Sequence, residues 1–216
     1  MMKEEELLKQ LFDEEDEFTD KQKKILMAAI EMFSEKGYAA TSTSEIAKKA
    51  GVAEGTIFRH YKTKKALLMS IVSPMMAKLL APFIIHDINK VLNTPFEQAE
   101  DFLRAVTENR RDFLKRNLPI VKIMLQEIPF QPELKEQFLD HVAKKTFERF
   151  TMIIEQYQNQ GQIIEMPSAS AARLALTTIF GFLFARYLFL PEHQWDDEQE
   201  TERTIQFILH GLALKS

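Results

Sequence analysis

The segment TSTSEIAKKAGVAEGTIFRHYKTKKALL, residues 41–68, constrains this chain more than any other. Ser42 and Glu45 have the spacing of a capping box, in which two side chains bond the first backbone N–H groups of a helix. Gly51 stops that helix after about two turns, because glycine readily adopts the left-handed conformation that follows a helix end. A tight turn then leads into a second short helix at 54–61. The segment therefore predicts two short helices in close succession.

Two short helices joined by a glycine-containing turn make a helix-turn-helix, whose second helix enters the major groove of DNA. Ala47 and Ala50 suit this interpretation, because helices that cross at close range need small side chains at the contact. Gly55 and Thr56 fall in the first turn of the second helix, where the backbone can approach another molecule. The segment thus predicts a DNA-binding module.

The rest of the chain is patterned for helices. Sustained apolar and polar alternation is lacking, and long stretches have helical spacing, so we expect an all-α protein of about nine helices. Thr19 and Gln22 form a capping box for a helix that Gly37 ends in the left-handed conformation. Pro74 and Pro82 should interrupt the helix that begins near residue 64. Further helices are expected at about 96–116, 118–128, 132–160, 168–190 and 197–213.

Charge is distributed unevenly along the sequence. Residues 1–19 carry two Lys and eight Asp or Glu, whereas residues 20–66 carry ten Lys or Arg and five acids. A basic module between acidic parts suits a protein that faces nucleic acid with one region only. We expect residues 1–19 to be an acidic N-terminal extension.

Other features argue against whole classes of protein. The chain has no cysteine, so disulfides and thiolate metal sites are excluded. It starts with an acidic segment and not with an apolar signal sequence. The apolar run at 174–190 is near the lower length limit of a membrane span and contains Arg186, and a buried helix explains it equally well. We expect a cytoplasmic protein with no membrane segment, metal or cofactor.

The stretch EIAKKAGVAEGTIFRHYKTKKALL resembles the DNA-binding signature of the tetracycline-repressor (TetR) family of bacterial transcriptional regulators. The resemblance covers roughly residues 20–68. It implies a three-helix DNA-binding domain at 20–66 and a larger helical domain at 67–216 for ligand binding and dimerisation. It also implies a homodimer on a palindromic operator, released by a small hydrophobic effector. A ligand-responsive repressor is the expected function.

The resemblance also assigns the positions that contact DNA. Those expected nearest base edges or adjoining phosphates are Ser44, Ala53, Glu54, Gly55 and Thr56. Those expected to meet the DNA backbone are Phe58, Arg59, His60 and Lys64. The sequence departs from the family at three of these positions.

Phe58 lacks the hydroxyl of the usual tyrosine, and Ser44 is shorter than the usual polar residue. Ala53 replaces a serine and gives up an N-cap worth about 1 kcal/mol. Glu54 has two interpretations, since it either complements the helix dipole or accepts a hydrogen bond from a cytosine amino group.

The larger domain is rich in Phe and Met, which line adaptable apolar cavities but more often fill a core. The resemblance implies an effector pocket among its central helices. The Phe and Met side chains indicate a hydrophobic effector, such as an aromatic or acyl-bearing molecule. The candidate pocket residues are Phe102, Phe113, Met124, Glu127, Phe147, Met152, Thr177, Phe180 and Phe184.

The segment SASAARLALTTIFGFLFARYLFL is apolar nearly all round, and such a helix must be covered on most sides. By resemblance it pairs with the last helix and with their two mates in a dimer, although packing within one chain is the alternative. The candidate interface residues are Ala172, Ala175, Gly181, Ile205, Ile208, Leu209 and Leu212.

Two other functions remain open at this point. A ligand-independent DNA-binding protein of chromosome organisation or division would share the module and the dimer. An all-α enzyme is less well supported, because the five histidines form no metal motif and no nucleophile elbow or phosphate-binding glycine loop is present.

Overall fold

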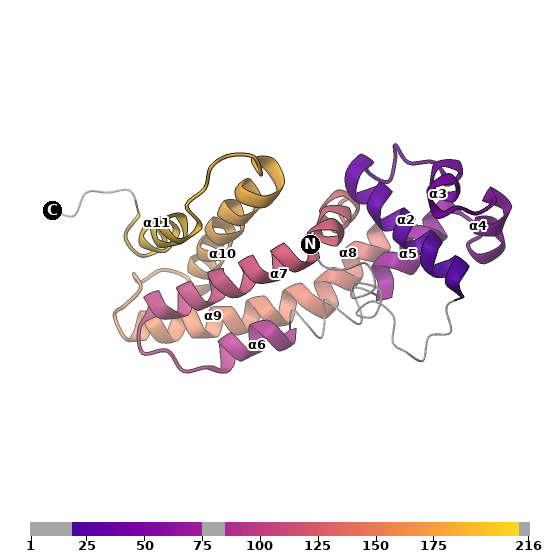
Figure 1. The fold of residues 1–216 in the computed structure, drawn as a ribbon. Coiled ribbons are helices and arrows are strands. Elements are labelled where there is room, and N and C mark those ends of the chain that lie inside the picture. The colour runs from indigo at the N-terminus through magenta and orange to yellow at the C-terminus, as the bar shows by residue number, and fades with distance from the viewer. Residues whose placement is uncertain (1–18, 75–84, 212–216) are drawn as a thin grey trace. The chain divides into compact units, whose positions relative to one another are not determined.

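The computed structural model describes residues 19–74 and 85–211 (Figure 1). Over these residues the protein forms ten α-helices and two short π-helical segments, and no strand. The all-α prediction is therefore confirmed, with ten helices against about nine expected from the pattern. The acidic extension up to residue 18, Pro82 and Leu212 lie outside the described residues.

The described helices are α2 (Asp20–Lys36), α3 (Thr43–Ala50), α4 (Glu54–His60), α5 (Lys64–Pro74), α6 (Ile85–Asn93), α7 (Ala99–Glu127), α8 (Pro132–Phe138), α9 (Lys144–Asn159), α10 (Ser168–Phe184) and α11 (Asp197–His210). The π-helical segments Leu139–Ala143 and Ala185–Phe189 follow α8 and α10. The prediction of one helix at 132–160 was wrong, because the π-helical segment Leu139–Ala143 divides this region into α8 and α9. The helix at 85–93 was not predicted separately.

The chain divides into two compact units. The first comprises residues 1–83 and 116–141, and thus contains α2 to α5, the end of α7, and α8. The second comprises residues 84–115 and 142–216, with α6, the start of α7, and α9 to α11. The functional domain boundaries after residues 19 and 66 stay a prediction.

Helix α7 runs from one unit into the other and is kinked on the way. Asn117 has φ −116° and ψ 19°, outside the helical range, and Pro119 lies inside the helix. A proline removes a backbone N–H and its ring collides with the preceding turn, which bends a helix. The break expected between 116 and 118 is therefore present as a kink and not as a helix end.

The core of the first unit lies along one face of α2. Ile25, Leu26, Ala29 and Phe33 are fully buried there. Helix α2 packs against α3 and α5, and α3 against α4. Their buried side chains are Ile46 from α3, Ile57 from α4, and Leu67, Leu68 and Ile71 from α5.

Both predicted capping boxes are confirmed. Thr19 and Gln22 bond reciprocally at the start of α2, and Ser42 and Glu45 at the start of α3. Gly51 ends α3 in the left-handed conformation, with φ 67° and ψ 34°. Gly37 was predicted to do the same after α2 and does not. Its φ of 84° is positive but its ψ is 156°, so the chain leaves α2 in an extended direction.

The second unit is centred on an aromatic cluster. The ring centroid of Phe102 lies 5.5 Å from that of Phe150, 5.7 Å from that of Tyr157 and 6.1 Å from that of Phe96. The Tyr157 hydroxyl donates a hydrogen bond of 3.0 Å to the Phe96 carbonyl. Burial raises the pKa of Tyr157, so this hydroxyl remains a donor at neutral pH. The cluster ties the start of α7 to α9.

A charged cluster joins α7 to the segment between α10 and α11. The Asp197 carboxylate accepts hydrogen bonds from Arg186 at 2.8 Å and from the Tyr187 hydroxyl at 3.1 Å. Lys115 of α7 lies 3.4 Å from the same carboxylate. These partners hold the pKa of Asp197 below its ordinary value against the opposing effect of burial.

The capping carboxylate of Glu45 should make the helix pair sensitive to acid. Hydrogen bonds from Lys36 and from Ser42 lower the pKa of Glu45 to about 2, against an ordinary value of 4.5. Because the pKa is lower in the folded protein, this carboxylate stabilises the fold above pH 4.5, and the contribution is lost as the pH falls towards 2. Glu45→Gln should flatten the pH dependence of urea unfolding over this interval.

Lys36→Met is the companion variant, since Lys36 is the largest cause of the lowered pKa. It should flatten the same dependence in part. A Glu45→Gln variant whose unfolding follows the wild-type pH profile would contradict the assignment.

Candidate nucleic-acid interface

Helix α4 presents a nearly continuous exposed surface. The seven-residue helix buries only Ile57, which anchors it to the module. The predicted contacts Ser44, Ala53, Glu54, Gly55, Phe58, Arg59 and His60 are exposed, and Thr56 and Lys64 are half-buried. Ala53 occupies the N-cap position with no side-chain hydrogen bond, as expected for this residue. Tyr61, in contrast, is buried under the module.

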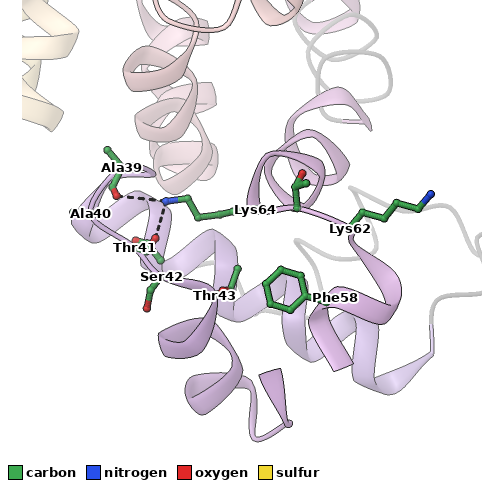
Figure 2. Close-up of a pocket in the computed structure, with 9 residues that line it drawn as sticks. Ala39, Ala40, Thr41, Ser42, Thr43, Phe58, Lys62 and Lys64 are labelled. Carbon is green, nitrogen blue, oxygen red and sulfur yellow. Dashed lines mark hydrogen bonds between the residues drawn. The ribbon is translucent and has the colours of Figure 1, made fainter. Parts of the chain in front are cut away.

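A hollow of about 570 Å³ opens beside α4 (Figure 2). It is bounded by the loop before α3 and by the turn between α4 and α5. Its lining residues are Ala39, Ala40, Thr41, Ser42, Thr43, Phe58, Lys62, Thr63 and Lys64.

Two helix starts face this hollow. Ser42 caps α3, and the Thr63 hydroxyl accepts a hydrogen bond of 2.9 Å from the Ala66 N–H at the start of α5. Helix starts carry partial positive charge and attract anions. Lys62 adds a full positive charge to this rim, and in Figure 2 its side chain points away from the loop. The surroundings of the hollow therefore favour an anion.

Lys64 has a different environment from Lys62. Its ammonium group donates to the carbonyls of Tyr38 at 2.7 Å and Thr41 at 2.8 Å, with a longer contact of 3.4 Å to Ala39. It also lies 4.3 Å from the centre of the Tyr38 ring. Figure 2 shows the side chain reaching across to the loop. In this structure the ammonium group of Lys64 holds the loop before α3, and its expected contact with the DNA backbone stays a prediction.

Thr43 and Glu54 are joined across the helix pair. The Thr43 hydroxyl, at the start of α3, donates a hydrogen bond of 2.7 Å to Glu54 Oε1, at the start of α4. Thr43 was not among the residues predicted from the sequence. No local pattern marks it, because Thr43 and Glu54 are 11 residues apart in the sequence and meet only where α3 and α4 cross.

Gly55 has no structural need to be glycine. Its φ is not positive, and an added Cβ would have nothing within 4 Å. Glycine in a helix costs about 0.5–1 kcal/mol relative to alanine. Because nothing within the described chain fills the space beside it, the missing side chain suits close approach of another molecule to the start of α4.

Two sequence patterns match the chain. The pattern described as "Bacterial regulatory proteins, tetR family" matches residues 25–71. The pattern described as "AefR-like transcriptional repressor, C-terminal domain" matches residues 99–210, more than half of the chain. The protein belongs to the TetR family. It is a DNA-binding transcriptional regulator and not an enzyme.

One relative of this TetR-family regulator matches it over most of both chains. The regulator is 29% identical to the uncharacterised HTH-type transcriptional regulator YvkB of Bacillus subtilis over 178 residues. This match covers 76% of this chain and 82% of YvkB.

Solved structures show the same fold. FadR of Bacillus subtilis, in complex with stearoyl-CoA, has a TM-score of 0.62 at 22% identity, over 88% of this chain and 98% of FadR. AibR, in complex with isovaleryl coenzyme A and operator DNA, has a TM-score of 0.66 at 20% identity, over 88% of this chain and 98% of AibR.

The nine candidate pocket residues of the regulator do not gather in one unit. Met124 and Glu127 belong to the first unit and the other seven to the second. Glu127 is buried near Tyr38, whose pKa is raised by burial and then by the Glu127 carboxylate. Phe102 fills the aromatic cluster, and Met152 is 63% exposed. The pocket assignment of the full set stays a prediction.

The candidate dimer residues also separate into two groups. Ala172, Ala175 and Ile205 are buried within their own chain, so the alternative of packing within one chain holds for them. Gly181 is exposed, and Ile208 and Leu209 are half-buried.

The exposed face of α10 is made instead by other positions. Leu174, Thr177 and Phe180 share it with Gly181 at helical spacing. Thr177 and Phe180, predicted for the effector pocket, therefore belong to this surface.

The described residues contain no candidate metal site. Within residues 19–74 and 85–211, no three His, Asp or Glu side chains lie close enough together to hold a metal ion.

The pair Lys62 and Lys64 allows a direct comparison of roles. Lys64→Met should lower the free energy of unfolding by about 1–2 kcal/mol, because charged hydrogen bonds to the loop are lost. Lys62→Met should change stability by less than about 0.5 kcal/mol, as surface substitutions do. It should instead weaken DNA binding at all sequences and lower the salt slope by about 1.

Urea unfolding and a salt series of DNA binding measure both effects. If the Lys64→Met variant has wild-type stability and a reduced salt slope, Lys64 contacts a DNA phosphate and does not stabilise the loop.

Gly55→Ala should separate stability from binding. We expect the variant to be more stable by about 0.5–1 kcal/mol and to bind DNA about tenfold more weakly, a loss of about 1.4 kcal/mol, because the new methyl group blocks close approach. Thermal unfolding and DNA titration test this. Equal or tighter DNA binding by the variant would contradict it.

Proposed function

We propose that this TetR-family regulator is a repressor that binds a palindromic operator as a homodimer and is released by an acyl-bearing effector such as an acyl-coenzyme A. The DNA-binding part of this proposal rests on the start of α4. Its side chains are exposed and mostly small, and the buried Ile57 anchors the helix to the module. A cytoplasmic location follows from this function, since the operator is bacterial DNA.

The DNA would meet two parts of the module. The first turn of α4 enters the major groove, with Ala53, Glu54, Gly55 and Thr56 towards base edges and Ser44 beside them. The hollow lined by Ser42, Thr63 and Lys62 receives backbone phosphate, since helix starts and lysine both attract anions. Arg59 and His60, exposed at the end of α4, add further backbone contacts.

The homodimer is supported by the uncovered surface of α10. Residues 168–189 are apolar and long enough to cross a membrane, yet only 28% of the most apolar stretch is buried. A second copy would cover the exposed face with Leu174, Thr177, Phe180 and Gly181, together with Phe207 of α11. A twofold dimer places two recognition helices about 34–36 Å apart, on successive turns of one groove.

The effector class is supported by two similar structures and by composition. FadR and AibR each bind an acyl-coenzyme A. The second unit of this chain holds Phe113, Phe147 and Phe184, which are half-buried. An acyl chain would lie against such side chains, and the ligand would release DNA if it binds better to a dimer whose recognition helices no longer match the groove spacing.

The first test is selection of random duplex DNA by the purified protein, followed by titration of the winning sequence with acyl-coenzyme A of several chain lengths. We expect an enriched palindrome, affinity that falls steeply with salt, and release by at least one acyl-coenzyme A at micromolar concentration. A reporter gene behind the palindrome should be expressed more strongly when the regulator is deleted.

The outcomes discriminate among functions. Failure to enrich any sequence overturns the proposal. An enriched palindrome that no acyl-coenzyme A releases would favour ligand-independent DNA binding, and lower reporter expression on deletion would make the protein an activator.

A charge on the α10 face should abolish the dimer. Leu174 is 46% exposed in one chain, and Leu174→Glu would bury unpaired carboxylates between two copies, which costs several kcal/mol. We expect a monomer by sedimentation equilibrium and operator binding weakened by about a hundredfold or more. Phe130→Glu is the matched control, because Phe130 is 79% exposed in the first unit. A dimeric Leu174→Glu variant would place the interface elsewhere.

A further inference from the structure

Glu54 is the single acidic residue of α4, and it stands at the start of this helix with its side chain exposed. Its Oε1 accepts the hydrogen bond of 2.7 Å from Thr43. The remaining residues of the exposed surface are small, aromatic or basic. A carboxylate here complements the dipole of α4, but DNA phosphates repel it, so its place on a DNA-binding surface needs a further explanation.

A carboxylate near DNA is favourable only against a hydrogen-bond donor. Phosphate oxygens repel it, and in the major groove the exposed donors are the amino groups of cytosine and adenine. The adenine amino group lies beside the N7 acceptor of the same base, which also repels a carboxylate. Cytosine presents its amino group without such a neighbour, so cytosine is the base that a glutamate selects.

The position of Glu54 brings it within reach of base edges. The first residues of the second helix in a helix-turn-helix contact bases. On either side of Glu54, Ala53 carries only a methyl group and Gly55 no side chain, and nothing lies within 4 Å of a Cβ added at Gly55. The carboxylate is therefore the longest acceptor at this end of α4.

Thr43 restricts where that acceptor points. A carboxylate has two oxygens, each able to accept hydrogen bonds, and Thr43 binds only Oε1. The hydrogen bond fixes the side-chain rotamer and leaves Oε2 available. Complementing the dipole of α4 is the competing explanation for Glu54, but that effect acts at any rotamer and needs no partner on α3.

We propose that Glu54 is a specificity-determining residue that accepts a hydrogen bond from a cytosine amino group through Oε2, with Thr43 as its positioning residue. The inference rests on the proposed binding of operator DNA. It assigns one cytosine to each half-site of the operator, at a position read by the first turn of α4.

The experiment is selection of random duplex DNA by the full-length wild type and by the variants Glu54→Gln, Thr43→Val and Thr43→Ser. The wild type should prefer cytosine at one half-site position by about tenfold or more. Glu54→Gln should shift that position towards adenine, which glutamine recognises through two hydrogen bonds. All other positions should keep their preferences.

Thr43→Val should lower the cytosine preference by about threefold or more while Thr43→Ser retains it, because only serine keeps the hydroxyl. Glu31→Gln is the matched control. It removes an acidic charge from the same module on α2, where Glu31 pairs with Lys49 at 2.6 Å. It should change overall affinity without changing any base preference.

The failures are distinguishable. If the wild type selects no sequence, the proposed DNA-binding function itself fails. If the wild type selects a palindrome and Glu54→Gln selects the same bases at every position, the function stands and the inference is overturned. Unchanged cytosine preference in Thr43→Val would overturn the role of Thr43, and urea unfolding of each variant verifies that the comparison is between folded proteins.

Discussion

The DNA-binding module depends on the ammonium group of Lys64. This single charge binds the carbonyls of Tyr38 and Thr41 in the loop between α2 and α3. The loop ends at Ser42, whose cap fixes the start of α3. Helix α4 packs on α3, so the position of its exposed first turn follows from the same contact. A lysine that looks from the sequence like a surface group is thus part of the framework.

Local signals were enough to predict the frame of the module. The capping boxes at Thr19 and Ser42 and the stop at Gly51 depend on residues three or four positions apart, and all three are present as expected. Local signals did not predict the conformation of Gly37, because its ψ is set by the loop that follows and not by the helix that precedes it. The hydrogen bond from Thr43 to Glu54 likewise requires two helices to cross before it can form.

The second unit was harder to predict, because an apolar side chain does not reveal what covers it. Phe102 and Phe180 were both candidates for the same pocket, yet one fills an aromatic cluster and the other lies on an exposed face. Ala172 and Gly181 are small residues of the same helix, and both were candidates for the dimer interface. Ala172 is buried within the chain, whereas Gly181 is exposed. Helical spacing identifies the faces of a helix, whereas tertiary packing decides which face is buried.

Gly55 has a consequence for how relatives of this protein diverge. Selection for stability alone would replace it, since alanine fits the space and favours the helix. The fold of the described chain therefore does not account for this glycine, whereas the proposed close approach of DNA does. A relative that keeps the fold but carries alanine or a larger residue at this position would not allow the same close approach of DNA to the start of α4. Such a relative could use the same fold for a function that does not involve an operator.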